Sequence, residues 1–508
     1  MSLDTTITAA ALAERAEVRR VAVSASLDAE SRGTLAQFLT PAPIAALLAS
    51  MFEPVAGPTR ILDAGAGAGS LTAALFARVL REQWSVTVHA HAVEVDEDLL
   101  PTLKETLREC QLAVPGSTSE LHAVDFIKWA IDQLPHGLFA QPQRFDLAIL
   151  NPPYRKLNTS SRERRLLRSA GIETSNLYSA FVALSLRLLA PSGQLVAITP
   201  RSFCNGPYFK TFREQILGEA AIKSTHLFDS RDKAFRDTAV LQENVIIHLV
   251  KGRTQGDIVV SSSGGSGHDA ITSRSVAFEK VVYPGDRNRF IHLVTDASQS
   301  EVPTRIGRLP LALLDLNVSV STGRVVDFRA QEHLRMQPEP GTVPLLYPMH
   351  LREGRIRWPG ASTKKACALV SNKATAALML PCGNYVLVKR FSSKEERRRL
   401  VASVLEADDF DTDLVAIENH VNVIHHHNLG LDLDIAWGLA TYFNSTILDQ
   451  YFRQFNGHTQ VNATDLRSLR FPSPIQLAAL GGEARIADHE QGTIDALVSR
   501  HVPVLAEG

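Results

Sequence analysis

The sequence of 508 residues contains only four cysteines, and none of them forms a Cys-x-x-Cys pair. A disulfide framework and a cysteine-based structural zinc site are therefore not indicated, and isolated thiols suit a reducing compartment. No apolar run approaches the roughly 18 residues of a membrane span, and the N-terminus lacks a signal-peptide pattern. We expect a cytoplasmic protein without a membrane segment. The cysteines are Cys110, Cys204, Cys367 and Cys382.

Neither sign of charge is in excess. The 53 Lys and Arg residues nearly balance the 54 Asp and Glu residues, which gives a formal net charge of -1. The overall charge does not point to a polyanionic partner, although balance can hide a local basic face, so nucleic acid is neither supported nor excluded. The length predicts two or three domains with a sizeable core.

A glycine-rich segment follows the first predicted strand. Residues 61–70 read Ile-Leu-Asp-Ala-Gly-Ala-Gly-Ala-Gly-Ser and run into a predicted helix at Leu71–Leu80. Glycines at 65, 67 and 69 permit positive φ and let a ligand lie against bare backbone. The spacing is not the Gly-x-Gly-x-x-Gly of dinucleotide enzymes, so no pyrophosphate is expected under the helix. Taken alone, the segment is either a structural turn or a loop for a nucleoside-type cofactor.

Acidic residues close the next two predicted strands. Glu94 ends the strand that begins near Val86, with Asp96 just beyond it, and Asp125 ends the third strand. A carboxylate in the place of Glu94 can accept both hydroxyls of a ribose. Asp125 can accept a hydrogen bond from an adenine amino group, and Phe126 can pack on the purine ring. The alternative, a solvated strand end, applies to Asp96 more than to Glu94.

The most distinctive stretch is Phe145–Tyr154, which reads Phe-Asp-Leu-Ala-Ile-Leu-Asn-Pro-Pro-Tyr. Its first six residues predict a strand buried on both faces, and the prolines end it. Asn151 and the carbonyl of Pro152 can accept hydrogen bonds from one exocyclic amino group, while Tyr154 can stack on the ring that carries it. The alternative is a strand followed by a proline turn.

These pieces together predict an α/β fold. Under a doubly wound topology the ends of the four strands form one crevice, where ligands bind. Further strands are expected at residues 194–199, 224–229 and 243–250, with a turn at Pro191–Gly193 and a helix at Asn176–Leu189. We expect a Rossmann-like, mostly parallel sheet of about seven strands, and a flexible loop at Ser261–Gly267.

Two flanking segments allow two interpretations each. Thr40 is a candidate N-cap, with Pro41 at the first position of a helix that includes Ile44–Phe52. The segment Arg155–Arg168 contains a single acid, Glu163, and is either a solvated face or a basic loop that contacts phosphates. Its basic residues are Arg155, Lys156, Arg162, Arg164, Arg165 and Arg168.

The α/β pattern that carries these motifs ends between residues 251 and 300, and we expect domains at 1–295 and 296–508. The second region is predicted to be mixed α+β, with a helix at Asp434–Arg453 and a polar loop at Gly457–Asn462 suited to groove or backbone contacts. His425–His427 are consecutive and cannot all face one ion, and no Cys or carboxylate spacing accompanies them, so no metal site is predicted.

In their order and residues, these motifs resemble the gamma class of DNA adenine-N6 methyltransferases, above all the PstI/BsuBI-type modification methylases of restriction systems. The motifs that carry the resemblance are Gln37–Pro41, Leu62–Gly67, Glu94, Asp125 and Asn151–Tyr154. They span most of residues 30–250, and Gly457–Phe471 resembles the family's C-terminal end more loosely. The resemblance implies transfer of a methyl group from S-adenosylmethionine to N6 of a flipped-out adenine in duplex DNA.

The resemblance also implies roles for individual residues. A cognate restriction endonuclease acting on the same site would be the counterpart of the enzyme, with no stable complex implied. The 296–508 region would recognise the DNA. An RNA or protein-glutamine N-methyltransferase is the alternative, because both use Asn-Pro-Pro-Tyr. The cofactor would be held by Thr40, Asp63, Gly65, Gly67, Glu94, Asp125 and Phe126, and the target base by Asn151, Pro152, Pro153 and Tyr154, with Phe209 stacking on its opposite face.

Overall fold

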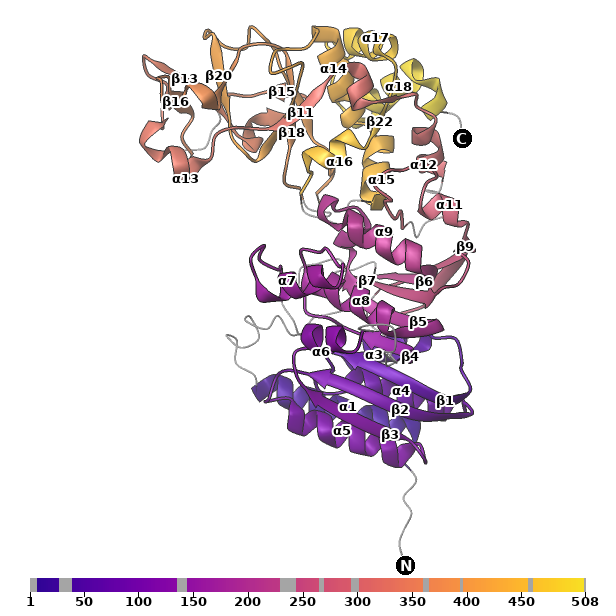
Figure 1. Ribbon diagram of the computed structural model, residues 1–508. Coiled ribbons are helices and arrows are strands. Elements are labelled where there is room, and N and C mark those ends of the chain that lie inside the picture. Colours follow the sequence, from indigo (N-terminus) through magenta and orange to yellow (C-terminus); the bar gives the residue numbers. More distant parts are fainter. Residues whose placement is uncertain are drawn as a thin grey trace, which may run out of the picture. The chain divides into compact units, whose positions relative to one another are not determined.

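A computed structural model of the protein describes residues 7–26, 39–134, 144–228, 244–264, 269–293, 301–359, 365–392, 396–455 and 460–506. The chain divides into two compact units, Met1–Thr295 and Asp296–Gly508 (Figure 1). No helix among these described residues is long and apolar enough to cross a bilayer.

The first unit is built on a nine-stranded sheet with the strand order β3-β2-β1-β4-β5-β7-β6-β8-β9. The chain runs outward from β1 to β3 and then returns to β4 beside β1, so the order reverses between β1 and β4. The strands are β1 (Gly57–Ala64), β2 (Val86–Glu94), β3 (Thr118–Ala123), β4 (Phe145–Leu150), β5 (Leu189–Pro200), β6 (Ala220–Phe228), β7 (Asn244–Lys251), β8 (Ile258–Ser263) and β9 (Thr272–Val276).

The sheet is larger than the seven strands expected from the sequence. Strands β1 to β5 pair in parallel, β7 is antiparallel to both β5 and β6, and β8 and β9 extend the edge beyond β6. The expectation of a flexible loop at Ser261–Gly267 is wrong for Ser261–Ser263, which pair with β6. His226 explains this, because its ring bonds the hydroxyls of Ser261 and Ser263 at 3.0 Å each. Gly264 follows β8, and residues 265–267 of that segment lie outside the described residues.

Helices cover both faces of this sheet because its inner strands are apolar on both sides. Within β4, Leu147 and Ile149 belong to one core and Ala148 and Leu150 to the other. The first core is covered by α1 (Ala9–Ser26), α3 (Ala42–Ser50), α4 (Ser70–Arg81) and α5 (Leu100–Ala113). The second is covered by α6 (Phe126–Asp132), α7 (Arg162–Ser169), α8 (Leu177–Leu188) and α9 (Lys210–Glu219).

Two local predictions in this unit need correction. Residues Pro191–Gly193, expected as a turn, are part of β5, where Ser192 has a φ of 63° and the register with β4 shifts. Thr40 does not cap the helix that follows it. Helix α3 begins at Ala42 with Pro41 as its N-cap and no side-chain cap bond, because the Thr40 hydroxyl is used elsewhere.

The described residues of the second unit form four small sheets and several helices. Two of the sheets are two-stranded, β10 (Leu311–Ala312) with β22 (Arg470–Phe471) and β14 (Leu351–Arg352) with β15 (Arg355–Ile356). The four-stranded sheet has the order β11-β21-β18-β19, and the five-stranded sheet has the order β12-β16-β13-β20-β17. The first comprises β11 (Ser319–Thr322), β21 (Val421–His425), β18 (Tyr385–Lys389) and β19 (Ala402–Leu405). The second comprises β12 (Leu334–Arg335), β16 (Ala368–Val370), β13 (Thr342–Leu346), β20 (Leu414–Ile417) and β17 (Met379–Pro381).

The helix expected at Asp434–Arg453 is two helices, α14 (Leu433–Phe443) and α15 (Thr446–Phe455). They part at Asn444, whose amide bonds both the N–H and the carbonyl of Ala402 on β19 at 3.0 and 2.8 Å. Asn side chains that bond backbone in this way compete with helix formation. The unit ends in α16 (Ala463–Arg467), α17 (Pro474–Ala484) and α18 (Gln491–His501). Residues 457–459 of the expected polar loop lie outside the described residues.

Candidate active site

The carboxyl ends of β1 to β4 lie level at one edge of the sheet. Ala64 pairs with Val93, Glu94 pairs with Ala123, and Asp63 pairs with Ile149. The segments that follow these ends line one cavity, as a doubly wound topology predicts. Its lining residues are Leu39, Gly65, Gly67, Val93, Glu94, Val95, Val124, Asp125, Phe126, Asn151, Pro152, Pro153, Arg155, Glu163, Leu177 and Phe181.

The glycine loop passes tightly between its neighbours. Gly65 and Gly67 have φ values of 74° and 57°, a region that other residues enter at a cost. A Cβ on Gly67 would stand 2.9 Å from the side chain of Leu39. The N–H of Gly65 donates to the Val93 carbonyl at 2.9 Å, which joins the loop to the end of β2. Glycine at these positions therefore allows the positive φ values and leaves the backbone of the loop exposed to the cavity.

Glu94 is buried at the end of β2 and organises the backbone around it. Its Oε2 accepts the N–H of Gly67 at 2.8 Å, and its Oε1 accepts those of Val95 and Asp96 at 2.8 and 2.9 Å. Burial raises the pKa of this carboxyl group despite these bonds. Glu94 thus lines the cavity while its carboxylate holds the glycine loop and the turn after β2.

Asp63 has a different place from the one expected. It is buried and absent from the cavity lining, and its Oδ2 accepts the hydroxyl and the N–H of Thr72 at 2.6 and 3.2 Å. Burial raises its pKa to about 7, with a contribution from the charge of Glu94. Asp63 thus anchors β1 to α4 behind the glycine loop, and the structure does not bring it into the cavity.

Asp125 and Phe126 lie where the sequence predicts, at the end of β3. The Oδ1 of Asp125 accepts the N–H of Lys128 at 2.9 Å and caps α6. Asp125 is exposed, so its second carboxylate oxygen remains accessible to a ligand. Phe126 is buried, and its ring lies 4.6 Å from that of Phe181. A planar ligand entering here would meet apolar walls with a carboxylate at one end.

Asn151 follows β4 directly, and its amide bonds the hydroxyls of Thr40 and Tyr154. Its Nδ2 donates to the hydroxyl of Thr40 at 2.9 Å, and its Oδ1 accepts the Tyr154 hydroxyl at 3.3 Å. Thr40 is buried and does not line the cavity, although we expected it to hold the cofactor. Its bond to Nδ2 fixes which way the amide points. Pro152 and Pro153 line the cavity beside it.

The aromatic residues form a connected series. Tyr154 meets Tyr178 edge-on with ring centroids 6.2 Å apart, and Tyr178 meets Phe209 at 5.4 Å. Burial raises the pKa of the Tyr154 hydroxyl, which therefore stays protonated and able to donate. Phe209 is only 5% exposed and packs in the core against Tyr178. Neither Tyr154 nor Phe209 is among the residues that line the cavity, and their stacking on a target base stays a prediction.

The sequence missed the wall supplied by α8. Leu177 and Phe181 both line the cavity, one helical turn apart on one face of that helix. Their spacing was visible, but an apolar pair in an amphipathic helix reads equally well as core. The sequence also did not assign Leu39, Val93, Val95, Val124 and Glu163 to the cavity lining. Val95 and Val124 are the two that a surface argument could have found. They are exposed apolar residues just beyond the ends of β2 and β3, and they face the same cavity.

The basic segment after Tyr154 divides into two groups. Arg164 and Arg168 pair with Glu173 at 2.6 and 2.7 Å, as expected for a solvated helix face. Arg155, Lys156, Arg162 and Arg165 are exposed, and Arg155 lines the cavity. The segment is therefore part ion-pair network and part exposed basic surface beside the site.

The switch in strand order and the acids and glycines at the strand ends define a doubly wound α/β domain of the kind that binds nucleotide or nucleoside cofactors. A family model described as Eco57I restriction-modification methylase matches residues 79–235. The chain is 42% identical over 491 residues to the type II methyltransferase M.PstI of Providencia stuartii, covering 96% of each chain. It is 46% identical over 456 residues to the type II methyltransferase M.BsuBI of Bacillus subtilis, covering 89% of this chain and 90% of that one.

The chain therefore belongs to the type II methyltransferases of restriction-modification systems, which confirms the resemblance seen in the sequence. One solved structure, the DrdV–DNA complex, shares the fold with a TM-score of 0.52 at 12% sequence identity. It covers 92% of this chain and 59% of that one.

Proposed function

We propose that this protein transfers a methyl group from S-adenosylmethionine to N6 of an adenine flipped out of duplex DNA, as the modification half of a type II restriction-modification system. The observation that carries the proposal is the meeting of two half-sites in one cavity. The glycine loop, Glu94 and Asp125 line one part of it, and Asn151, Pro152 and Pro153 line another.

The first half-site suits a cationic nucleoside cofactor. Glu94 is placed for ribose hydroxyls, Asp125 for the adenine amino group, and Phe126 with Phe181 for the purine faces. Gly65 and Gly67 leave room for the methionine portion against the backbone. The carboxylates of Glu94 and Asp125 favour the positive charge of a sulfonium ion. When bound, this cofactor would supply the methyl group, and its positively charged sulfur would leave as a neutral thioether.

The second half-site suits an amino group on a planar ring. The N6 lone pair of adenine is delocalised into the ring and is a poor nucleophile. Hydrogen bonds from its two N–H groups to Asn151 Oδ1 and the Pro152 carbonyl push the nitrogen towards sp³ character, so that it can attack a methyl group directly. Orientation and fixed dipoles then carry the catalysis, and no cysteine nucleophile is needed.

The target base has to leave the duplex to reach this cavity. Extruding the base costs a free energy on the order of a few kcal/mol, and stacking of the base on one or two aromatic side chains can offset this cost. Tyr154 is our choice for the first ring, with Phe209 for the second after a rearrangement of the Tyr178 contact. The exposed side chains of Arg155, Lys156 and Arg162 are placed beside the site for contacts to phosphates.

We favour duplex DNA as the substrate over RNA or a protein glutamine, because the similarity to type II methyltransferases extends over most of the chain. M.PstI and M.BsuBI match the chain over 96% and 89% of its length, so the match includes the 296–508 unit as well as the cavity. We propose that this unit recognises the DNA sequence. We place the enzyme in the cytoplasm, since its four cysteines, all among the described residues, form no disulfide, and infer a cognate endonuclease without a stable complex.

The test is transfer of a tritiated methyl group from S-adenosylmethionine to duplex DNA, RNA and protein in parallel. We expect incorporation into DNA alone, as N6-methyladenine in the digested product. Asn151→Ala is expected to abolish transfer while cofactor affinity changes by less than a few fold. Labelling of RNA or protein instead of DNA, or loss of cofactor binding in Asn151→Ala, would overturn the assignment.

A further inference from the structure

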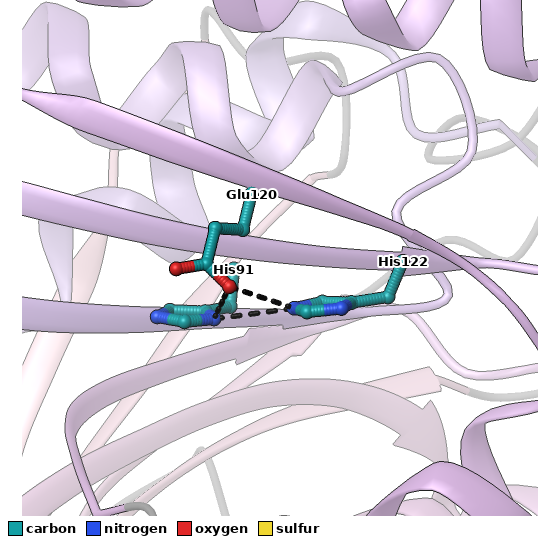
Figure 2. A group of neighbouring side chains, drawn as sticks. All are labelled: His91, Glu120 and His122. Atoms are coloured by element: carbon teal, nitrogen blue, oxygen red, sulfur yellow. Dashed lines mark hydrogen bonds and ion pairs between the residues drawn. The ribbon is translucent and has the colours of Figure 1, made fainter.

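Two histidines and a glutamate meet on neighbouring strands of the first unit, away from the cavity lining. His91 lies on β2, and Glu120 and His122 lie on β3 (Figure 2). The parallel register sets His91 opposite Glu120 and Val93 opposite His122. Because side chains alternate along a strand, these three point to the same face of the sheet, the face covered by α6.

The three ligand atoms form a compact triangle. His91 Nδ1 is 3.2 Å from His122 Nε2, His91 Nδ1 is 3.5 Å from Glu120 Oε2, and His122 Nε2 is 3.7 Å from the same oxygen. Ligands bound to a tetrahedral zinc ion at its usual bond lengths stand about 3.4 Å apart. One cation can therefore lie about 2 Å from all three atoms without any movement of the backbone.

The donor set selects a class of ion. Two imidazole nitrogens and one carboxylate suit Zn²⁺ and the neighbouring first-row divalent cations, whereas Ca²⁺ and Mg²⁺ require more oxygen ligands. The side chain of His91 is 4% exposed and that of Glu120 is 63% exposed, so the group is open to solvent on the glutamate side.

Aromatic neighbours fix the imidazole rings. The ring of His91 meets Phe145 edge-on at 5.2 Å, and the ring of His122 lies 5.0 Å from that of Trp129. The two imidazoles are themselves nearly parallel, with centroids 5.5 Å apart and an interplanar angle of 8°. The nitrogens are thus held in place before any ion arrives, which lowers the cost of binding.

Arg60 opposes the ion. Its Nη2 lies 3.4 Å from His91 Nε2, and because a guanidinium only donates, that nitrogen accepts and the imidazole proton lies on Nδ1. A cation at Nδ1 shifts this proton to Nε2 and requires Arg60 to turn away. Arg60 is half-buried on β1, and its guanidinium lies over the ring of Phe145, 5.4 Å from the ring centroid.

We propose that His91, Glu120 and His122 bind one divalent transition-metal cation of the Zn²⁺ type. The ion would join β2 to β3 on one side of the sheet. Glu94 lies further along β2, and Asp125 follows β3. By linking the two strands, the ion would limit the movement of these two cavity-lining acids relative to each other. This site takes no part in methyl transfer, and its proposal stands apart from the proposed function.

The experiment uses the full-length protein after removal of metals with a chelator. Addition of Co²⁺ is expected to produce the visible absorption bands of a four-coordinate ion, saturating at one equivalent. Zn²⁺ should abolish these bands by displacement and raise the temperature of thermal unfolding. Absence of both the bands and the stabilisation would overturn the proposal.

Variants locate the ion. Glu120→Gln and His122→Gln are expected to weaken Zn²⁺ binding by at least a hundredfold. Since Glu120 is exposed, its variant should fold even if His122→Gln does not, and circular dichroism checks both. His89→Gln, on the same face of β2, and the pair His426→Gln/His427→Gln are controls that should bind as the parent does. Equal binding in Glu120→Gln, or loss in a control, would place the ion elsewhere.

Arg60→Ala supplies a change in the opposite direction. It removes the positive charge and the donor that hold the His91 proton on Nδ1, so we expect Zn²⁺ to bind at least tenfold more tightly than to the parent. Weaker binding in Arg60→Ala would contradict the ligand geometry, because Arg60 would then be supporting the ion.

Discussion

The hydroxyl of Thr40 accepts a hydrogen bond from the amide nitrogen of Asn151 at 2.9 Å, across 111 positions of the sequence. The amide oxygen is thereby turned to the opposite side, where it meets the hydroxyl of Tyr154. A residue that precedes α3 thus decides the orientation of the side chain on which the proposed chemistry depends. Thr40 is a positioning residue, because it acts through Asn151.

Thr40→Val keeps the shape of the side chain and removes the acceptor. We expect kcat to fall by about ten- to a hundredfold, the usual effect of a misplaced reacting group, while the affinity for S-adenosylmethionine changes little. Thr40→Ser should restore most of kcat. Equal loss in the serine and valine variants, or a defect confined to cofactor affinity, would favour the direct cofactor role that the sequence predicts.

Glu94→Gln should weaken cofactor binding in two ways, by removing a negative charge and by disturbing the hydrogen bonds that hold the glycine loop. A glutamine presents an NH₂ group where Glu94 now accepts backbone N–H groups from Gly67 or from Val95 and Asp96. We expect the Kd for S-adenosylmethionine to rise at least tenfold, about 1.4 kcal/mol, with a lower urea midpoint. Calorimetric titration measures the first and equilibrium unfolding the second.

Asp125→Asn is the matched comparison for Glu94→Gln. Its oxygen can still accept the N–H of Lys128, so α6 keeps its cap and the urea midpoint should not change. Cofactor affinity should fall, because the second carboxylate oxygen is replaced by a donor. Unchanged cofactor affinity in both variants would show that neither Glu94 nor Asp125 binds the cofactor.

Asp63→Asn should alter how stability depends on pH. Burial raises the pKa of Asp63 from 3.8 to about 7, so the folded protein holds this proton more tightly than the unfolded chain does. The contribution of Asp63 to stability is complete below the unfolded pKa and is lost as the pH rises towards 7. Asparagine does not titrate. The variant should therefore gain stability relative to the parent as the pH rises from about 4 to about 7 in urea unfolding, and a constant difference over that range would contradict the raised pKa of Asp63.

Two adjacent glycines of α17 offer a paired test of the packing in the second unit. A Cβ on Gly481 would overlap the Asp434 carbonyl and lie 2.6 Å from the backbone nitrogen of Gly438 on α14, whereas a Cβ on Gly482 meets open space. Gly481→Ala should destabilise by about 2–3 kcal/mol through overpacking. Gly482→Ala should stabilise by about 0.5–1 kcal/mol, since alanine favours the helix. Similar effects on urea unfolding would show that α14 and α17 are not in close contact.

Much of the site was predictable because local rules act over a few residues. A buried strand ending in Asn-Pro-Pro-Tyr, a run of spaced glycines and an acid at a strand terminus each have a direct physical reading. Glu94, Asp125 and Asn151 lie at one edge of the sheet, as these readings require. The roles of these residues in methyl transfer remain predictions.

Other features depended on partners distant in the sequence. Asp63 follows the same local pattern as Glu94, yet it faces Thr72 of α4 and not the cavity. The helix expected at 434–453 divides at Asn444, whose amide bonds Ala402. In both cases a local preference was overruled by a hydrogen bond that only the folded chain supplies.

The amino-acid sequence by itself determined the chemical groups at the strand ends and the order in which they occur, because strand, turn and glycine preferences are properties of short segments. The tertiary structure decided which groups meet. The bond between Thr40 and Asn151 and the triangle of His91, Glu120 and His122 arise from packing and strand register, and a register shifted by one residue would turn those side chains to opposite faces of the sheet.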